Sequence, residues 1–229
     1  NMGLGYGMTE IFVVCVCTPE DIGFGTSGKP VPLMKIRVSD EGELQMTSPA
    51  QMAVYWKKEE ASKAMLTSDG WIKSGDVGEI TPDGYIKITD RIKELIITAG
   101  GKNISPLLIE TSLKDDIYID QAVAIGDARK YISALIVPSY ELLMQYASDN
   151  GIFFKGKEDL VRNPEIIKFY KERIEEATKD LGQVEKIKSF TLLPAELTQE
   201  SGELTPTSKL KRKIINQKYT DVINSMYIE

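Results

Sequence analysis

Four clusters of polar residues in this chain have residue types and spacing that suit a phosphorylated ligand. The first cluster is Gly5-Tyr-Gly-Met-Thr-Glu10. Its glycines would let the backbone approach a ligand closely, and Tyr6 could stack on a flat base. The oxygen atoms of Thr9 and Glu10 are suited to a phosphate and its Mg²⁺. An ordinary turn leading into a strand explains the same residues, so this cluster alone decides nothing.

The second cluster ends at Asp76, and Arg91 opens the third. Asp76 closes the segment Trp71-Ile-Lys-Ser-Gly-Asp76, where a carboxylate could accept hydrogen bonds from two neighbouring ribose hydroxyls. An aspartate that caps a turn is the plainer interpretation. Arg91 is a permanent cation with a forked set of donors, and a surface salt bridge with Asp90 or Glu94 would explain it equally well.

The third cluster continues to Gly100 and Gly101, which predict a tight strand-to-helix turn. The fourth cluster runs from Leu204 to Lys213 and ends in four cations within five positions. We expect a helix to begin at Ser208, which would put these cations where the helix dipole disfavours them. Cations in an unfavourable place suggest an anionic ligand, although a solvated basic surface is an equally good explanation.

Composition excludes several classes of function. The 229-residue chain has a net charge of −6 and no histidine. The acidic balance argues against nucleic-acid binding, and the absence of histidine excludes Ser-His or Cys-His catalysis and a His-liganded metal. Cys15 and Cys17 lie two apart in an expected strand, which is typical of buried, reduced thiols. No apolar run approaches the roughly 20 residues that span a bilayer.

The elements that would position these clusters change in kind near residue 90. Up to that point hydrophobic alternation and turn glycines predict antiparallel strands. Beyond residue 91, strands alternate with helices that begin at Ser105-Pro106, Ser139 and Asn163-Pro164. The expected strands are 11–17, 33–39, 43–47, 77–81, 84–89, 95–98, 121–126, 131–137 and 187–193, and the expected helices are 57–65, 106–114, 139–151, 164–181 and 208–223.

In this order and at this spacing, the four clusters resemble the adenylate-forming superfamily. The segments Thr98–Pro106 and Leu204–Arg212, with a long helical insertion between them, are most similar to AMP-forming long-chain fatty acyl-CoA synthetases. The resemblance implies an α+β fold in two parts. Residues 1–90 would be the antiparallel, β-rich, distorted-barrel end of a large AMP-binding N-terminal domain. Residues 91–229 would be a small, mobile α+β lid domain.

The resemblance also implies roles for the residues of the first part. Tyr6 would pack on the adenine of ATP, and Thr9 would contact a phosphate. Glu10 would help to hold Mg²⁺. Asp76 and Arg91 would bind the ribose hydroxyls. These roles together describe the binding of ATP for the activation of a fatty acid to acyl-AMP.

For the second part, the resemblance implies a hinge and two faces. Lys93 would be the hinge about which the lid turns. Lys209 would reach the α-phosphate and the carboxylate during adenylation, and Gly100 and Gly101 would line the CoA pantetheine tunnel during thioester formation. The implied partners are a fatty acid, ATP and CoA, without nucleic acid. A cytoplasmic location is expected, with peripheral membrane association and oligomeric state left open.

Two departures from the family pattern accompany the resemblance. Ile11 stands where relatives commonly carry threonine or serine, and Thr207-Ser-Lys209 replaces the more usual Ser-Gly-Lys. The phosphate loop and the acyl pocket are expected upstream of residue 1. We therefore expect a C-terminal part of a ligase that is inactive alone. An aryl- or short-chain acyl-CoA synthetase and a carrier-protein-loading adenylation domain remain alternatives. A non-catalytic nucleotide-binding module is disfavoured because Asp76, Arg91 and Lys209 are present.

Overall fold

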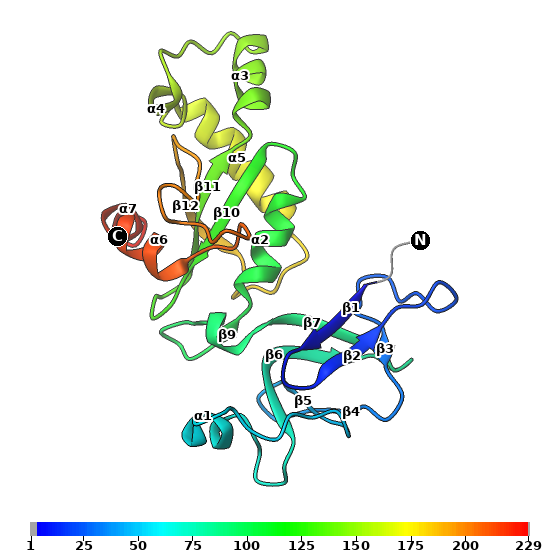
Figure 1. Cartoon of the computed structure of the whole chain (residues 1–229). Helices are drawn as coiled ribbons and strands as arrows, with labels where there is room; N and C mark the ends of the chain where they lie inside the picture. The colour runs from blue at the N-terminus through cyan, green and yellow to red at the C-terminus, as the bar shows by residue number, and fades with distance from the viewer. Residues whose placement is uncertain (1–3, 229) are drawn as a thin grey trace. The chain divides into compact units, whose positions relative to one another are not determined.

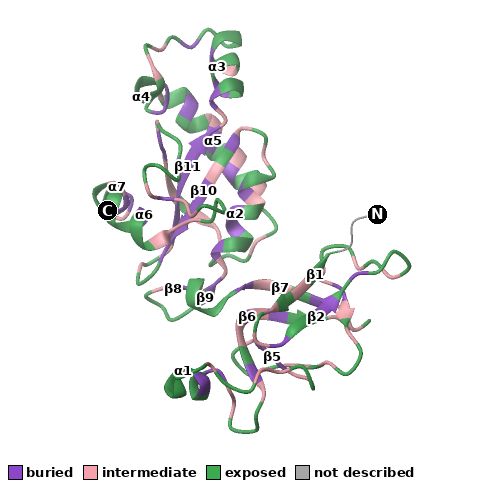
Figure 2. Ribbon diagram, viewed as in Figure 1, coloured by how far each residue is buried: buried purple, intermediate pink, exposed green. Residues whose placement is uncertain are grey.

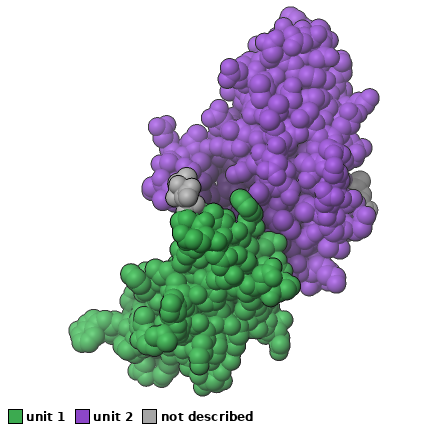
Figure 3. Space-filling view, turned by 90° about the vertical axis from the view of Figure 1, so that its right-hand side faces the viewer, with its two compact units in different colours: residues 1–94 green, residues 95–229 purple. Residues whose placement is uncertain are grey.

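The computed structural model describes residues 4–228 and divides into two compact units. The first unit ends at Glu94 and the second begins at Leu95, as the colours of Figure 3 show. Each unit has its own hydrophobic core. The expected division at residues 90 and 91, where the sequence pattern changes from antiparallel strands to alternating strands and helices, stays a prediction.

The first unit is built from a three-stranded and a four-stranded sheet with the orders β1-β2-β3 and β4-β5-β6-β7 (Figure 1). All of its strand pairs are antiparallel. The elements are β1 Gly5–Met8, β2 Phe12–Val16, β3 Lys29–Pro30, β4 Lys35–Val38, β5 Glu43–Thr47, α1 Glu59–Ala64, β6 Ile72–Ile80, β7 Ile86–Arg91 and the 3₁₀ turn η1 Ile92–Glu94.

Both sheets contribute to one apolar core, which confirms the expected β-rich, barrel-like first part. The buried residues of this core are Ile11, Val14, Cys15, Leu44, Met46, Met65, Ile72 and Ile86. Cys15 and Cys17 are buried and free, as expected. Burial raises the pKa of the Cys15 thiol to about 11, so this cysteine is a packing residue rather than a nucleophile.

Two expectations for the first strands are wrong. The segment Gly5–Met8 is not a loop but a strand, because it pairs with β2 through a turn at residues 9–11. A Cβ at Gly7 would lie 2.4 Å from the carbonyl oxygen of Phe12, so close pairing requires glycine there. β2 is also not buried throughout, since Phe12 is 75% exposed.

The second unit has a three-stranded mixed sheet in the order β10-β11-β12, accompanied by helices and a small two-stranded sheet. β10 and β11 are antiparallel, whereas β11 and β12 are parallel. The elements are β8 Ile96–Ile97, β9 Asn103–Ile104, α2 Pro106–Lys114, β10 Ile119–Ile125, β11 Ile132–Pro138, α3 Tyr140–Asp149, α4 Lys157–Leu160, α5 Pro164–Ala177, β12 Ile187–Leu192, α6 Arg212–Lys218 and α7 Thr220–Ser225.

Burial and caps explain these elements. All seven residues of β11 are buried (Figure 2), as in a strand covered on both faces. Ser105 accepts a hydrogen bond from the Leu108 amide, and Asn163 accepts one from the Glu165 amide, so both expected N-caps are confirmed. Ser139 precedes α3 but makes no such cap bond. No helix within residues 4–228 is long and apolar enough to cross a membrane.

Two expected helices have different limits. α5 ends at Ala177 rather than Leu181. At the next residue the Thr178 hydroxyl donates to the Ile174 carbonyl at 2.7 Å and so competes with the backbone amides for this acceptor. The last helix begins at Arg212 rather than Ser208, because Ser208 has a φ of +57° in a tight loop. Helix α6 then ends at Lys218, and a second helix, α7, begins at Thr220.

A buried carboxylate attaches α6 to the segment that follows β12. Glu203 is 0% exposed, and its Oε1 lies 2.5 Å from Lys218 Nζ. Its other oxygen accepts a hydrogen bond from the Ser201 hydroxyl. Burial by itself would raise the pKa of Glu203, but the bonds from Lys218 and Ser201 outweigh burial and lower its pKa to about 2.

Replacing this carboxylate should remove a pH-dependent part of the second unit's stability. Because the folded pKa lies below the ordinary value, the charged form stabilises the fold above about pH 4.5, and this stabilisation is lost as the pH falls towards 2. We expect Glu203→Gln to lower the free energy of unfolding at pH 7 by about 1–3 kcal/mol and to flatten its decline below pH 4.5. Urea unfolding, followed by far-ultraviolet circular dichroism from pH 3 to 7, measures both effects. Equal pH slopes in the two proteins would contradict the assignment.

Candidate nucleotide-binding site

The best-defined polar cluster of the first unit forms around Asp76. The register of β6 and β7 sets Asp76 directly opposite Arg91, and Arg91 Nε lies 3.0 Å from Asp76 Oδ1. The Tyr6 hydroxyl, from β1, donates to Asp76 Oδ2 at 2.5 Å. The structure therefore brings together three of the residues that the sequence singled out, from three different strands.

Local backbone geometry fixes the Asp76 carboxylate. Gly75 has a φ of +72°, which favours glycine, and its amide donates to Glu43 Oε1 at 2.9 Å. The Ser74 hydroxyl accepts from the Asp76 amide at 3.0 Å and donates to the Leu44 carbonyl at 2.6 Å. Sequence analysis missed Glu43. Its only local signal is an acidic residue at the start of an otherwise uncharged strand.

The charges of this cluster differ in exposure. The side chain of Asp76 is 8% exposed and that of Arg91 is 63% exposed. Burial, and then the hydrogen bond to Asp76, raises the pKa of Tyr6, so its hydroxyl remains a donor at neutral pH. Each carboxylate oxygen has two lone pairs. Asp76 can therefore keep both protein partners and still accept bonds from a pair of neighbouring hydroxyl groups.

Thr9 and Glu10 lie in the turn between β1 and β2. Thr9 is exposed and Glu10 is half-buried. The Tyr55 hydroxyl donates to Glu10 Oε1, and this bond, followed by burial, raises the pKa of Tyr55. The Met52 amide donates to the Glu10 carbonyl at 2.8 Å. Tyr55 was not predicted, because a partner 45 positions away leaves no local pattern.

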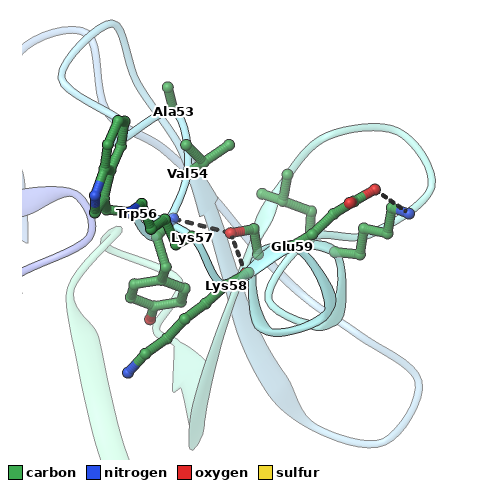
Figure 4. A pocket seen from close by; sticks show the side chains of 10 residues that line it. Ala53, Val54, Trp56, Lys57, Lys58 and Glu59 are labelled. Carbon is green, nitrogen blue, oxygen red and sulfur yellow. Dashed lines mark hydrogen bonds and ion pairs between the residues drawn. The ribbon is translucent and has the colours of Figure 1, made fainter.

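Tyr55 also lines a surface hollow of about 600 Å³ (Figure 4). The hollow is formed by residues 53–59 with Ser62, Lys63 and Leu66. The Ser62 hydroxyl accepts from the Tyr55 amide at 2.9 Å and donates to the Lys58 carbonyl at 2.8 Å. Helix α1 thereby holds the loop that carries Tyr55, and this loop in turn holds Glu10.

Lys93 and the glycine pair lie on exposed backbone. Lys93 is an exposed residue of η1. Gly100 and Gly101 form the turn of the β8–β9 hairpin, in which the Gly101 amide donates to the Thr98 carbonyl at 2.8 Å. The expected strand-to-helix turn is therefore wrong, because a second short strand separates the glycines from α2. Gly101 does have a φ of +73°, which suits glycine.

Lys209 is displayed by a tight loop in the second unit. Leu204 and Leu210 form an isolated bridge. Inside it, the Thr205 amide donates to the Lys209 carbonyl at 2.8 Å, and the Lys209 amide donates to the Thr205 hydroxyl at 3.0 Å. The side chain of Lys209 is exposed. Lys209 therefore precedes the helix instead of lying in its first turn, so the expected conflict with the helix dipole does not apply to it.

Arg212, another cation of the fourth cluster, is paired inside the protein. Its two terminal nitrogens donate to Glu110 Oε1 and Oε2 at 2.7 and 2.8 Å. The Ala124 amide also donates to Glu110 Oε1, at 2.9 Å. Arg212 thus joins α6 to α2 and β10 three positions after Lys209. Glu110 was not predicted, although it is an acidic residue beside the buried positions Ile109 and Leu113.

The predicted residues thus fall into separate groups. Tyr6, Asp76 and Arg91 are in mutual contact, and Thr9 and Glu10 lie in the turn that follows Tyr6. The glycine pair and Lys209 belong to the second unit. The first group has the donors and acceptors to hold a hydroxylated, partly aromatic ligand, and Lys209 is an exposed cation suited to an anion.

Comparison with known proteins identifies the family. The profile of the "AMP-binding enzyme C-terminal domain" matches residues 93–229. This chain belongs to that family. The long-chain-fatty-acid–CoA ligase FadD15 of Mycobacterium tuberculosis is 37% identical over 225 residues, which are 97% of this chain and 37% of that ligase. The long-chain-fatty-acid–CoA ligase 1 of Homo sapiens is 32% identical over 97% of this chain and 34% of its own length.

Solved structures of adenylation domains confirm the fold class. The adenylation domain of the carboxylate reductase from Mycobacterium chelonae has a TM-score of 0.74 and 24% identity, over 98% of this chain and 34% of that one. The corresponding domain from Segniliparus rugosus, in complex with AMP and a carboxylic acid, has a TM-score of 0.73 and 20% identity over 98% of this chain and 35% of that one. At these identities the likeness is one of fold alone.

The Lys209 loop yields a stability prediction. Ser208 occupies the left-handed region at a φ of +57°, which costs a non-glycine residue roughly 1–2 kcal/mol. Glycine would remove this strain, but glycine also gains more freedom on unfolding, which offsets part of the gain. We therefore expect Ser208→Gly to raise the free energy of unfolding by about 0.5–1 kcal/mol. Ser112→Gly, inside α2, is the matched control and should lower the free energy by a similar amount. Urea unfolding measures both; a loss with Ser208→Gly would be the contrary result.

Proposed function

We propose that this chain is the C-terminal part of a long-chain fatty acid–CoA ligase, which activates a fatty acid with ATP and then transfers the acyl group to CoA. Relatives that carry this name match nearly the whole chain at 32–37% identity. The chain spans just over a third of their length. The complete reaction is accordingly proposed for the full-length protein, and the chain by itself is proposed to be inactive.

The observation that carries the proposal is the Tyr6–Asp76–Arg91 cluster. Asp76 is buried but retains acceptor capacity, as two ribose hydroxyls would require. Tyr6 presents a ring beside it, on which adenine could stack. Arg91 supplies an exposed cation on the same carboxylate. Arg91, with Asp76, would meet the ribose hydroxyls, and an aromatic base and a vicinal diol are both parts of an adenine nucleotide.

The second unit would stabilise negative charge during adenylation and then present a different face to CoA. When the fatty-acid carboxylate attacks the α-phosphorus and pyrophosphate leaves, negative charge builds up on the phosphate oxygens. Lys209, exposed at the tip of its loop, would stabilise this charge. A rotation about Lys93 would withdraw Lys209 and bring the Gly100–Gly101 turn to the pantetheine of CoA. One hinge would then serve both half-reactions.

Mg²⁺ fits this site only together with a nucleotide. Residues 4–228 contain no group of three or more His, Cys, Asp or Glu side chains that could hold a metal ion. Glu10, with the neighbouring Thr9 hydroxyl, offers the hard oxygen ligands that Mg²⁺ accepts alongside phosphate oxygens and water. When bound, Mg²⁺ would neutralise charge on the ATP phosphates. We place the ligase in the cytoplasm, drawing its fatty acid from solution or from a membrane surface.

The proposed reaction predicts a dependence on both acyl length and CoA. AMP release by the full-length protein, measured with carboxylic acids of two to twenty carbons, should be greatest for long chains and should require CoA. Long chains are favoured because each further methylene buried in the acyl pocket adds about 0.8 kcal/mol to binding. Adenylation without a CoA thioester, or a maximum at short or aromatic acids, would contradict the proposal.

Asp76→Asn and Asp83→Asn provide the matched pair for this assay. The amide introduced by Asp76→Asn would lose the charge-assisted bonds at a buried position, and we expect AMP release to fall at least tenfold. Asp83 is an exposed aspartate in the β6–β7 turn, and its substitution should leave the rate within a factor of two. Equal rates for the two variants would show that Asp76 does not belong to the site.

Lys209→Ala should separate the two half-reactions of the full-length protein. Loss of a cation that acts only on the charge developing at the α-phosphate should slow pyrophosphate release by roughly 10²–10³. CoA attack on supplied acyl-adenylate should change little, because Lys209 would be withdrawn in that step. Lys114→Ala, at the exposed end of α2, is the control. An equal loss in both half-reactions would show that Lys209 has another role.

A further inference from the structure

Strand β12 forms an open edge of the second unit's sheet. Its only strand neighbour within residues 4–228 is β11 (Figure 1). Proteins often keep their edge strands short or cover them, because an open row of backbone donors and acceptors attracts another strand. β12 is six residues long and its residues are only partly buried up to Leu192. The edge is therefore long enough to pair with a further strand.

The hydrogen bonds of the sheet show which backbone groups face outward. The Leu193 amide donates to the Ile136 carbonyl of β11 at 2.8 Å. Successive residues of a strand direct their backbone groups to opposite sides, so those of Ser189 and Thr191 also face β11. The N–H and C=O groups of Phe190 and Leu192 then point along the open edge, whereas Lys188 lies at a register irregularity between the pairs Ile132–Ile187 and Ser133–Ser189.

Two hollows follow this edge. One, of about 680 Å³, is lined by β12 residues up to Phe190 and by α5 residues such as Ile174. The other, of about 650 Å³, is lined by Phe190 and the residues after it, with Ile167 of α5 and Val222 of α7. Since Phe190 belongs to both, the hollows together border the whole strand. Helix α5 contributes residues to both hollows.

The charges beside the first hollow favour one kind of occupant, whereas the second hollow has one acidic and one basic side chain, Glu158 and Arg162. Lys171, Lys186 and Lys188 line the first hollow with a single acidic residue, Glu175. We propose that β12 is a docking edge for an extended, acidic segment of a partner protein, which would add to the sheet as a strand beside β12 and α5. Backbone bonds to β12 would supply affinity and the lysines would select acidic side chains. A second copy of β12 fits poorly, because its own lysines would meet these lysines.

A pair of synthetic peptides tests the proposal on the 229-residue chain. The acidic probe alternates glutamate and valine over eight residues, and the basic control alternates lysine and valine. We expect the acidic peptide to slow hydrogen exchange at the amides of Phe190 and Leu192 and to leave those of Ser189 and Thr191, which pair with β11, unchanged. Exchange is followed residue by residue by NMR. No change at millimolar peptide, or equal binding of the basic peptide, would overturn the proposal.

Charge reversal provides a second readout that does not disturb the fold. Lys188 and Lys168 are both exposed, but only Lys188 lines the edge. Lys188→Glu should weaken the acidic peptide roughly fivefold, as expected for one exposed charge pair, while Lys168→Glu should leave the affinity unchanged. Equal weakening by both variants would show that the peptide responds only to net charge and would overturn the proposal. Self-association through β12, seen by sedimentation at the same protein concentration, would assign the edge to a second copy and also overturn the proposal.

Discussion

A carboxylate that leaves water must find donors within the protein, and this constraint organises both units. Unpaired, such a group costs several kcal/mol. Asp76 and Glu110 are each 5% exposed, Glu43 is 9% exposed and Glu203 is 0% exposed. Each accepts at least one hydrogen bond from a residue distant in sequence. Each therefore fixes the register of segments that hydrophobic burial alone would only bring near one another.

In the first unit this constraint produces the proposed nucleotide site. Asp76 draws Tyr6 and Arg91 onto its two oxygens, while Glu43 holds the backbone of Gly75 immediately before it. In the second unit, Glu203 accepts from Lys218, and Glu110 accepts from Arg212. The loop between these two anchors carries Lys209. Paired charges are thus buried on either side of the cation that is left exposed for an anion.

Hydrophobic and turn signals that act over a few residues were read correctly from the sequence. The hairpins turned at Gly42 and Gly84, the Ser105 and Asn163 caps and the buried β11 strand all follow from local pattern. The errors occur where another contact overrides such a pattern. Ser208 looked like a helix cap, but the Leu204–Leu210 bridge curls that segment into a loop, and α6 begins only at Arg212.

The sequence by itself determined the kinds of element, the two-part α+β organisation, the family and most of the residues proposed to meet the nucleotide, because each depends on residue types at short spacing. Only the tertiary structure decided that Gly5–Met8 is a strand, that Tyr55 supports Glu10 and that Arg212 is spent on Glu110 rather than kept for a ligand. The tertiary structure alone also shows that β12 lies at the edge of its sheet. These outcomes depend on which distant backbone edges and buried charges meet, and burial in three dimensions sets those meetings.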